Sequence, residues 1–551
     1  MRRDPGVFRP VGFLFPAIGL LLLVLGAAWI PFPKTPGLVE EWSYVYAFDR
    51  GQPWIAPDFL SMMPTRPLLP FVYGIAYRLT PGSFAGLQLV HMLVLFGKGV
   101  VAALLARRLR PADPAFAALL AALFVVFPAD RALLLTRDTG SHFSVLFLLL
   151  ATLLLFDYAE APRPLAALGL WGSQALALGT YEHGFLVLFA APLLLAFVSE
   201  SRPRSGAHWA RLLVVWYAVP LVLGVWTWTV LHGRDSYQAR LLQSDSATGA
   251  ALLLGTLRAI PAALARHFIG GWAEAARGLA HLRPGDLTAA ALPAIFAAFA
   301  LLRTSTPQMG KARSRGLLVA GVVALVLGAI PFLVAPGLRG ETRRVYLVSS
   351  FGAALFFSAA IVRVRDVPRG RPLAALAASA LVLLAVTGAR MQRRVVEDTG
   401  LRERKILRGI VEAMPNPAAG ALVLFLDAEG PPRTEELFGL TKTDVHLADA
   451  VRVVYRRFDI PFLVFGRPLA HYWNGRAHAG PEGVTVSFTD GRSMLFPYDR
   501  VTAFREDAAG SVSLLTVLPP LLFPFPAAAR YAPGPLLGSG APPARLETLV
   551  P

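Results

Sequence analysis

Long apolar runs, separated by short charged segments, follow one another through the first 390 residues of the chain. A helix needs about 20 mainly apolar residues to cross a bilayer, and about eleven runs approach that length. They cover residues 11–31, 84–106, 114–128, 143–158, 164–180, 184–198, 212–231, 287–302, 316–335, 346–362 and 372–388. The pattern predicts a polytopic α-helical membrane protein with about eleven transmembrane helices.

Composition agrees with this class. Only 16% of the residues are charged and 55% are hydrophobic, whereas soluble domains have about 25% charged residues. The net charge of +18 fits membrane topology and anionic lipid headgroups as readily as nucleic acid, for which the chain carries no motif. The chain has no cysteine, which excludes disulfides, zinc thiolates and cysteine nucleophiles.

The distribution of cations predicts the orientation in the membrane. With the N-terminus in the cytoplasm, the cytoplasmic segments carry about twice as many Lys and Arg residues as the short outer loops. We therefore expect a multi-pass protein of the inner (cell) membrane with a cytoplasmic N-terminus. The segment from Arg390 onward is then extracytoplasmic.

Most acidic residues fall on the opposite side from the cations. Ionisable groups near membrane depth are costly, so their concentration on one face favours a shared polar cavity there. The alternative is that these charges lie in loops because loops are solvated. The carboxylates expected on the outer face are Glu40, Glu41, Asp49, Asp58, Asp130, Asp138, Glu182 and Glu341.

Two regions between the apolar runs predict helices that lie at the membrane surface. The stretch "VEEWSYVYAFDR" contains no helix breaker, and the apolar segment that follows it, residues 65–82, is too short to span. Residues 232–286 alternate apolar and basic patches, which is typical of interfacial helices that cover a lipid groove. We expect interfacial helices in 39–82 and in 232–286.

The order of these features resembles a known family. An acidic pair in the first outer loop is followed by "RPLLPFVYGIAYRL" and "LQLVHMLVLFGKGVVAALLARRLRP", and then by "FPADRALLLTRDTGSHFSVLFLLLATLLLFDYA". This layout is similar to that of the GT-C superfamily of integral-membrane glycosyltransferases. Members of this type include protein O-mannosyltransferases, lipid A aminoarabinose transferases and tetratricopeptide-containing membrane mannosyltransferases. The resemblance covers roughly residues 10–390 and implies a GT-C-like core.

The resemblance also implies a reaction. Such enzymes take a sugar from a polyprenyl phosphate, an acceptor hydroxyl attacks the anomeric carbon with inversion, and lipid phosphate is released. A carboxylate must accept the proton of the hydroxyl, and cations must stabilise the leaving phosphate. By position, Glu41 or Glu40 matches the family's first-loop base.

Other outer-face residues are candidates for binding acceptor, sugar or phosphate. Arg suits phosphate because its planar fork binds two oxygens at once, although anchoring of lipid headgroups is the alternative. A divalent cation at Glu182 and His183 is a further alternative, and no cofactor is required by the sequence. The substrate-binding candidates are Asp49, Arg66, Arg131, Arg137, Asp138, His142, Glu182, His183, Arg339, Arg343 and Arg344. We expect the first, second and third outer loops and the "GETRRVY" loop to surround one cavity.

The composition changes after residue 389. A charged helix, a strand and alternating apolar residues around Asp490 and Gly491 predict a small extracytoplasmic α/β domain over 390–517. Residues 518–551 are rich in Pro and predict an irregular tail. The expected partners are a lipid-linked sugar donor, membrane lipids and an acceptor that is a protein, lipid or glycan, with no nucleic acid.

Two other classes of function fit the same pattern less well. A transporter or flippase of a lipid-linked substrate should show internal repeats or paired broken helices with charges at the midplane, and neither stands out. A catalytically inert membrane scaffold that kept the family layout is the second alternative.

Overall fold

We describe a computed structural model of the chain. It describes residues 10–29, 37–38, 40–51, 63–111, 113–198, 205–233, 249–304, 311–334, 345–426, 444–457, 460–465, 476–487, 492–507, 511–538, 540–541, 543 and 545–549. The chain divides into two compact units. Unit 1 holds residues 1–32, 57–72 and 89–393, and unit 2 holds residues 33–56, 73–88 and 394–551. Each unit is described by itself.

Unit 1 is helical, as the apolar runs predict. Within the described residues, eight helices are long and apolar enough to cross a membrane, and three shorter apolar helices accompany them. The polytopic helical membrane class is thus confirmed. The α-helices that lie wholly or mostly in this unit, whether or not they belong to those two groups, are α1 (Pro10–Trp29), α5 (Ala85–Leu109), α6 (Pro114–Val125), α7 (Thr139–Glu160), α8 (Pro164–Thr180), α9 (Ala190–Val198), α10 (Gly206–Gly233), α12 (Gly249–Ala265), α13 (Gly271–Leu279), α14 (Pro284–Arg303), α15 (Lys311–Val334), α16 (Val345–Arg365) and α17 (Gly370–Ala413).

One region is more continuous than expected. A π-helical turn, Arg266–Gly270, joins α12 to α13, so that residues 250–279 form a single apolar helix. Its 30 residues are long enough to span a membrane. The sequence predicted interfacial helices here because basic residues interrupt the apolar pattern. Their position relative to the bilayer stays a prediction, and residues 234–248 of this region lie outside the described part of the chain.

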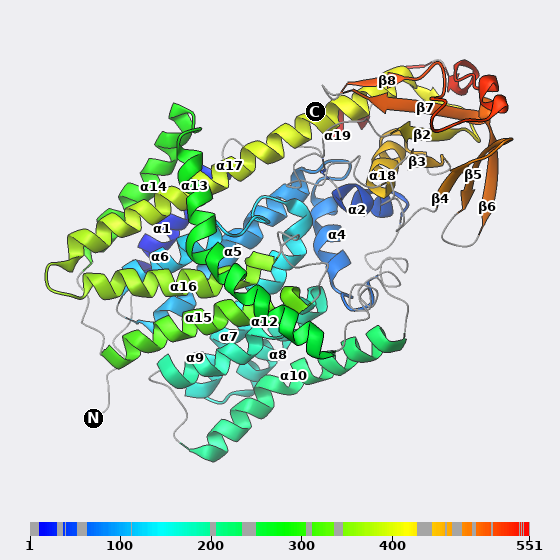
Figure 1. The fold of residues 1–551 in the computed structure, drawn as a ribbon. Helices are drawn as coiled ribbons and strands as arrows, with labels where there is room; N and C mark the ends of the chain where they lie inside the picture. The colour runs from blue at the N-terminus through cyan, green and yellow to red at the C-terminus, as the bar shows by residue number, and fades with distance from the viewer. Residues whose placement is uncertain are drawn as a thin grey trace. The chain divides into compact units, whose positions relative to one another are not determined.

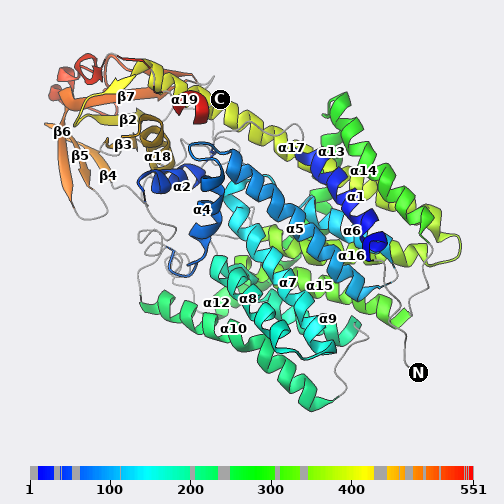
Figure 2. The same ribbon diagram turned by 180° about the vertical axis from the view of Figure 1, so that it is seen from behind.

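The helices α15 and α16 lie side by side along their length (Figures 1 and 2). Glycines allow this close approach, because the interface leaves no room for a side chain. A Cβ on Gly352 would lie 2.1 Å from the backbone nitrogen of Leu325, and one on Gly328 would lie 2.8 Å from the backbone of Ser349. Small residues at such positions are typical of helix contacts in membranes.

Unit 2 is the small strand-containing domain that the sequence predicts after residue 389, and it also includes two segments, 33–56 and 73–88, from the region that follows the first apolar run. One of these segments holds α2 (Glu40–Asp49), and the other holds the second half of α4 (Leu69–Leu79). The remaining helices of this unit are the end of α17, α18 (Asp444–Tyr455) and α19 (Arg545–Leu549).

Two sheets make up most of the strand structure of unit 2. One has the order β3-β2-β7-β8, with parallel pairing of β2 to both β3 and β7, and the other has the antiparallel order β4-β5-β6. A short pair, β1 with β9, completes them. The strands are β1 (Asn416–Pro417), β2 (Leu422–Leu426), β3 (Phe462–Phe465), β4 (Arg476–Ala479), β5 (Gly483–Ser487), β6 (Ser493–Pro497), β7 (Val501–Glu506), β8 (Val512–Leu514) and β9 (Leu537–Gly538). The β5–β6 pair is the hairpin expected around Asp490 and Gly491.

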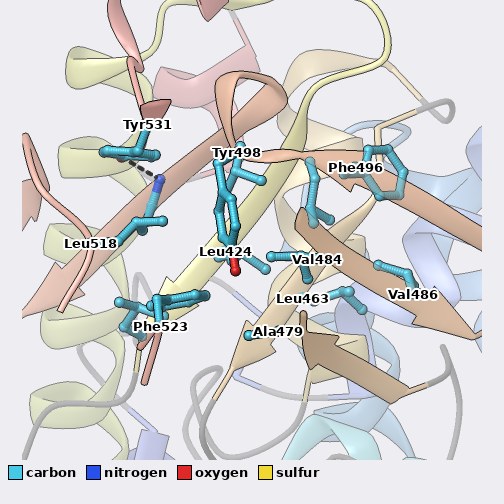
Figure 3. Close-up of a cluster of buried hydrophobic side chains, with 14 residues drawn as sticks. Leu424, Leu463, Ala479, Val484, Val486, Phe496, Tyr498, Leu518, Phe523 and Tyr531 are labelled. Atoms are coloured by element: carbon cyan, nitrogen blue, oxygen red, sulfur yellow. Dashed lines mark hydrogen bonds between the residues drawn. The ribbon is translucent and has the colours of Figure 1, made fainter. Parts of the chain in front are cut away.

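Side chains from both larger sheets share one apolar core. Leu424 and Leu463 of the first sheet pack with Val484 of the second (Figure 3). Phe523 and Tyr531 join the same cluster from the Pro-rich segment. Tyr531 is fixed there because its hydroxyl accepts a hydrogen bond from the Ala503 amide at 2.9 Å, as Figure 3 shows. The segment after residue 517 therefore has few strands, but it closes the core of the domain.

Candidate active site

The acidic pair Glu40 and Glu41, either of which matches the base that the resemblance implies, lies in the first turn of α2. Glu41 is fully buried, whereas Glu40 beside it is partly exposed. Trp42 is also fully buried, donates its indole hydrogen bond to the Gly37 carbonyl and packs edge-on against Phe84 at 4.8 Å between ring centroids. Burial separates the two adjacent carboxylates into one enclosed group and one that is open to solvent.

Asp49, at the other end of α2, is held by protein groups. The Tyr77 hydroxyl and the Arg545 guanidinium both donate to its carboxylate, and one Arg545 nitrogen lies 3.0 Å from Oδ1. Burial and this hydrogen bond raise the pKa of the Tyr77 hydroxyl. The sequence suggested that Asp49 binds substrate. In the structure both of its carboxylate oxygens accept hydrogen bonds from Tyr77 or Arg545.

In unit 1 the structure brings together two of the expected residues from different loops. Arg66 donates from Nε and Nη2 to the two carboxylate oxygens of Glu182, at 2.7 and 2.6 Å, although the residues are 116 positions apart. The Tyr181 ring lies face-on to the guanidinium, 3.7 Å from Cζ to the centroid. The two segments meet because the Leu68 amide donates to the Gly179 carbonyl at 2.9 Å. The two hydrogen bonds from Arg66 to Glu182 fix both the position and the plane of the guanidinium.

His183 lies next to this pair and is buried. Its ring packs between Tyr181, at 4.6 Å, and Phe332, at 5.8 Å. In the described parts of the chain, no group of three or more His, Asp or Glu side chains is placed to hold a metal ion. The aromatic surroundings give His183 a packing role in this structure, and the cation alternative gains no support from the described residues.

The second-loop candidates are buried as well. Asp138 ends a short 3-10 turn, Thr136–Asp138, that leads into α7, and Arg137 Nε lies 3.9 Å from its carboxylate. One turn later, His142 Nδ1 lies 3.3 Å from the ammonium of Lys98 on α5. Binding of substrate by Asp138 and His142 stays a prediction.

Three buried polar residues around His142 were missed. Lys98 is fully buried with its ammonium 4.3 Å from the centre of the Phe124 ring, and His91 lies about two turns before it on the same side of α5. His91 contacts the Thr139 hydroxyl at 2.8 Å and the Leu133 carbonyl at 2.7 Å. The signal was available, since a lysine inside an apolar span is a candidate functional residue by default.

Asp130 is the third missed residue. Its side chain is fully buried, Oδ1 accepts from the Ala132 amide at 3.0 Å, and Oδ2 has no hydrogen-bond partner among the described residues. Burial raises the pKa of this carboxyl to about 6, which the attraction of Lys98 only partly opposes. The sequence counted Asp130 as one more loop carboxylate, because burial depends on how the loop folds back.

Arg131, a candidate for binding phosphate, pairs with a carboxylate of the protein. It donates to both oxygens of Glu274 on α13, at 2.8 and 3.0 Å, and Arg266 in the π-helical turn donates to the same carboxylate. Two guanidinium groups thus share one carboxylate at the junction of the second loop and the helix over residues 250–279. Binding of phosphate by Arg131 stays a prediction.

The remaining candidates are not placed. Arg339, Arg343 and Arg344 lie outside the described residues. Glu40, Glu41 and Asp49 belong to unit 2, whereas Arg66, Arg131, Arg137, Asp138, His142, Glu182 and His183 belong to unit 1. The convergence of all these residues on one cavity therefore stays a prediction.

Comparisons with known proteins find similarity at the level of layout. The crystal structure of ArnT from Cupriavidus metallidurans bound to undecaprenyl phosphate is 15% identical, with a TM-score of 0.38, over 83% of this chain and 86% of that one. The apo structure of the same protein gives a TM-score of 0.36 at the same identity. No protein-family model and no curated protein sequence matches the chain. At scores this low the likeness carries no functional argument.

Proposed function

We propose that the chain is a membrane glycosyltransferase that moves a sugar from a polyprenyl-phosphate donor to an acceptor hydroxyl on the extracytoplasmic face. The observation that carries the proposal is Glu41. It is a fully buried carboxylate in the first turn of a short helix, at the position where the sequence pattern calls for a general base. Ionisable residues at membrane depth are functional-site candidates by default, and Glu41 is more deeply buried than the neighbouring Glu40.

In the proposed reaction, Glu41 accepts the proton of the acceptor hydroxyl as its oxygen attacks the anomeric carbon of the donor sugar. The new carbon–oxygen bond forms on the face opposite the phosphate, and the sugar–phosphate bond breaks. The bonding electrons leave with the phosphate oxygen, so the products are an inverted glycoside and polyprenyl phosphate. General base catalysis of this kind contributes about 10²–10⁴-fold to rate.

Arg66 is the residue that we propose to stabilise the charge on the leaving phosphate. Its guanidinium is held in one plane by Glu182 and covered by Tyr181. A cation that is already oriented stabilises developing charge without the cost of reorganisation. Glu182 then acts by holding Arg66, and this accounts for a carboxylate beside a phosphate-binding cation.

The proposal is tested with purified protein in membranes that supply acceptors. Radiolabelled polyprenyl-phosphate mannose and polyprenyl-phosphate aminoarabinose serve as donors, and released polyprenyl phosphate is measured together with transfer of label. Glu41→Gln should lower release by about 10²–10⁴-fold without loss of folded protein. Glu40→Gln is the matched comparison, because it makes the same change at the less buried neighbour; a loss of release in Glu40→Gln alone would assign the base to Glu40.

The outcomes separate the proposal from its alternatives. Full release by Glu41→Gln, by Glu40→Gln and by the double variant would exclude a base in the first loop. Movement of the intact lipid-linked sugar across the membrane without its cleavage would identify a flippase. Arg66→Ala should slow release strongly, whereas Arg66→Lys should retain part of the activity because the charge remains while the fork is lost.

A further inference from the structure

The helix that carries Glu41 is packed against aromatic side chains on one side. Tyr44 stacks on Tyr73 of α4 with 3.7 Å between ring centroids and 12° between planes, and Phe48 stacks on Tyr77 at 5.4 Å and 23°. The partners are four residues apart on both helices, which is the spacing of one face. The two ring pairs therefore align α2 and α4 over one full turn.

Polar side chains of α18 also hold α2 in place. The Ser43 hydroxyl donates to Asp449 at 2.6 Å and lies 3.2 Å from His446 Nδ1. One turn further along α2, the Tyr46 ring is 5.8 Å from the guanidinium carbon of Arg452. Since α18 belongs to the C-terminal part of the chain, α2 is built into that domain.

A third set of contacts fixes the end of α2. We define the α2 clamp as Asp49, Tyr77 and Arg545. Arg545 donates to both oxygens of Asp49 and also to the Val453 carbonyl at 3.3 Å, while Tyr77 donates to Asp49. Only 5% of the Asp49 side chain is exposed. A two-pronged Arg–carboxylate pair sets direction as well as distance, so the clamp resists rotation of α2 about its axis.

We propose that the α2 clamp positions Glu41 for catalysis and that Arg545 is a positioning residue of this enzyme. The inference rests on the proposed function of Glu41. Glu41 lies eight residues before Asp49, roughly 12 Å along the helix axis, so Arg545 acts on it through the helix. A helix of ten residues is marginal on its own. Its orientation therefore depends on these contacts.

The expected size of the effect follows from how precisely a base must be held. Catalytic groups have to stay within about 0.5 Å and 10–20° of the productive geometry, and a misplacement of about 1 Å costs on the order of 10²-fold in rate. Arg545→Met should therefore lower kcat by about 10–100-fold and leave the KM for the donor unchanged. Arg545→Lys should recover part of kcat, because a point charge replaces the fork.

Asp49 provides the discriminating comparison. If Asp49 acts only through the clamp, Asp49→Asn should lower kcat as much as Arg545→Met does. The kcat of the double variant should then be no lower than that of the more severe single variant. If Asp49 binds substrate, Asp49→Asn raises KM and the two effects add. The second result would overturn the proposal.

The control and the structural readout use other features of the chain. Arg408 pairs with Glu547 on α19 at 3.1 Å near the surface, so Arg408→Ala disturbs the same helix without touching Asp49 and should keep kcat. Because the chain has no cysteine, a spin label at Ala47→Cys reports on α2 alone. Arg545→Met should increase the mobility of this label, and Arg408→Ala should not.

Failure of the clamp and failure of the proposed function give different results. Full kcat or an immobile label in Arg545→Met, with transfer by the unsubstituted protein, would overturn the positioning role only. No transfer by the unsubstituted protein from either labelled donor would overturn the proposed function itself. A KM increase without a kcat decrease in Arg545→Met would assign Arg545 to binding instead of positioning.

Discussion

Arg365 donates two hydrogen bonds to Asp113, at 3.0 and 2.6 Å, across 252 positions of the chain, and both side chains are almost fully buried. Arg110 donates to the same carboxylate at 2.6 Å and to Asp366 at 2.6 Å. Asp113 also caps α6, since its Oδ1 accepts from the Phe116 amide at 3.1 Å. One carboxylate thus ties together the ends of α5, α6 and α16.

Removal of that carboxylate should destabilise unit 1 strongly. Asp113→Ala leaves two buried guanidinium groups without their shared partner, and breaking a buried pair costs about 3–5 kcal/mol. The temperature of unfolding in detergent, followed by near-UV circular dichroism, should fall sharply. Arg108→Ala is the control, because its partners Asp157 and Glu160 are more than a third exposed and such pairs contribute about 0–1 kcal/mol. Equal effects of the two variants would contradict the assignment.

Asp130 should make stability depend on pH. Its pKa is raised by burial from 3.8 to about 6, against the attraction of Lys98 and with the repulsion of Asp138. The folded state therefore favours the protonated form. The contribution of Asp130 to the free energy of unfolding is fully present below pH 3.8 and is lost as the pH rises through 6. At pH 7.5 the loss is about 3 kcal/mol.

Asp130→Asn should remove this loss. The variant is expected to unfold at a higher temperature than the unsubstituted protein at pH 7.5 and at the same temperature near pH 4. Thermal unfolding in detergent at both pH values measures the difference. A variant that is less stable at pH 7.5 would show that the ionised carboxylate is stabilising, and our account of its burial would be wrong.

The contact between α15 and α16 predicts a large effect of one methyl group. Gly352→Ala would place a Cβ 2.1 Å from the backbone of α15, so the helices must separate, and overpacking typically costs 1–3 kcal/mol. Gly172→Ala on α8 is the matched control, since a Cβ there meets nothing within 4 Å. It should be neutral or stabilising, because Ala favours helix over Gly by about 1 kcal/mol. Similar unfolding temperatures for the two variants would argue against close packing.

Topology can be measured with a reporter fused after Ala389. The excess of Lys and Arg in one set of loops predicts an extracytoplasmic position for this point. An alkaline phosphatase fusion should be active, and a green fluorescent protein fusion at the same point should be dark. The opposite pattern would place the whole C-terminal domain in the cytoplasm and would remove the assignment of Glu41 to the outer face.

The apolar runs predicted the helices of unit 1 well. The run over 164–180 coincides with α8, because Pro164 sets its first turn and the polar "TYEHG" segment follows its last. The run over 84–106 became α5, which continues to Leu109. Length and hydrophobicity are local properties, and they largely decide where a membrane helix begins and ends.

The partners of the site residues could not be predicted in the same way. Arg66 meets Glu182 where a backbone hydrogen bond joins two segments that are far apart in the sequence. The local sequence of either segment does not indicate which other segment it will contact. The burial of Lys98 depends on Phe124 and His142 from two other helices. The docking of α2 onto α18 was also missed, since Ser43 and Asp449 are about 400 positions apart.

The separation between Asp49 and Arg545 sets an order of events during synthesis. Their contact spans 496 positions, and at 5–20 residues per second the ribosome needs roughly 25–100 s to add them. During that interval a newly made α2 has no α18 or α19 to dock against, although Tyr73 and Tyr77, on which Tyr44 and Phe48 stack, are already present. Completion of unit 2 is therefore one of the last steps in the maturation of this protein, whatever the speed at which its membrane helices insert.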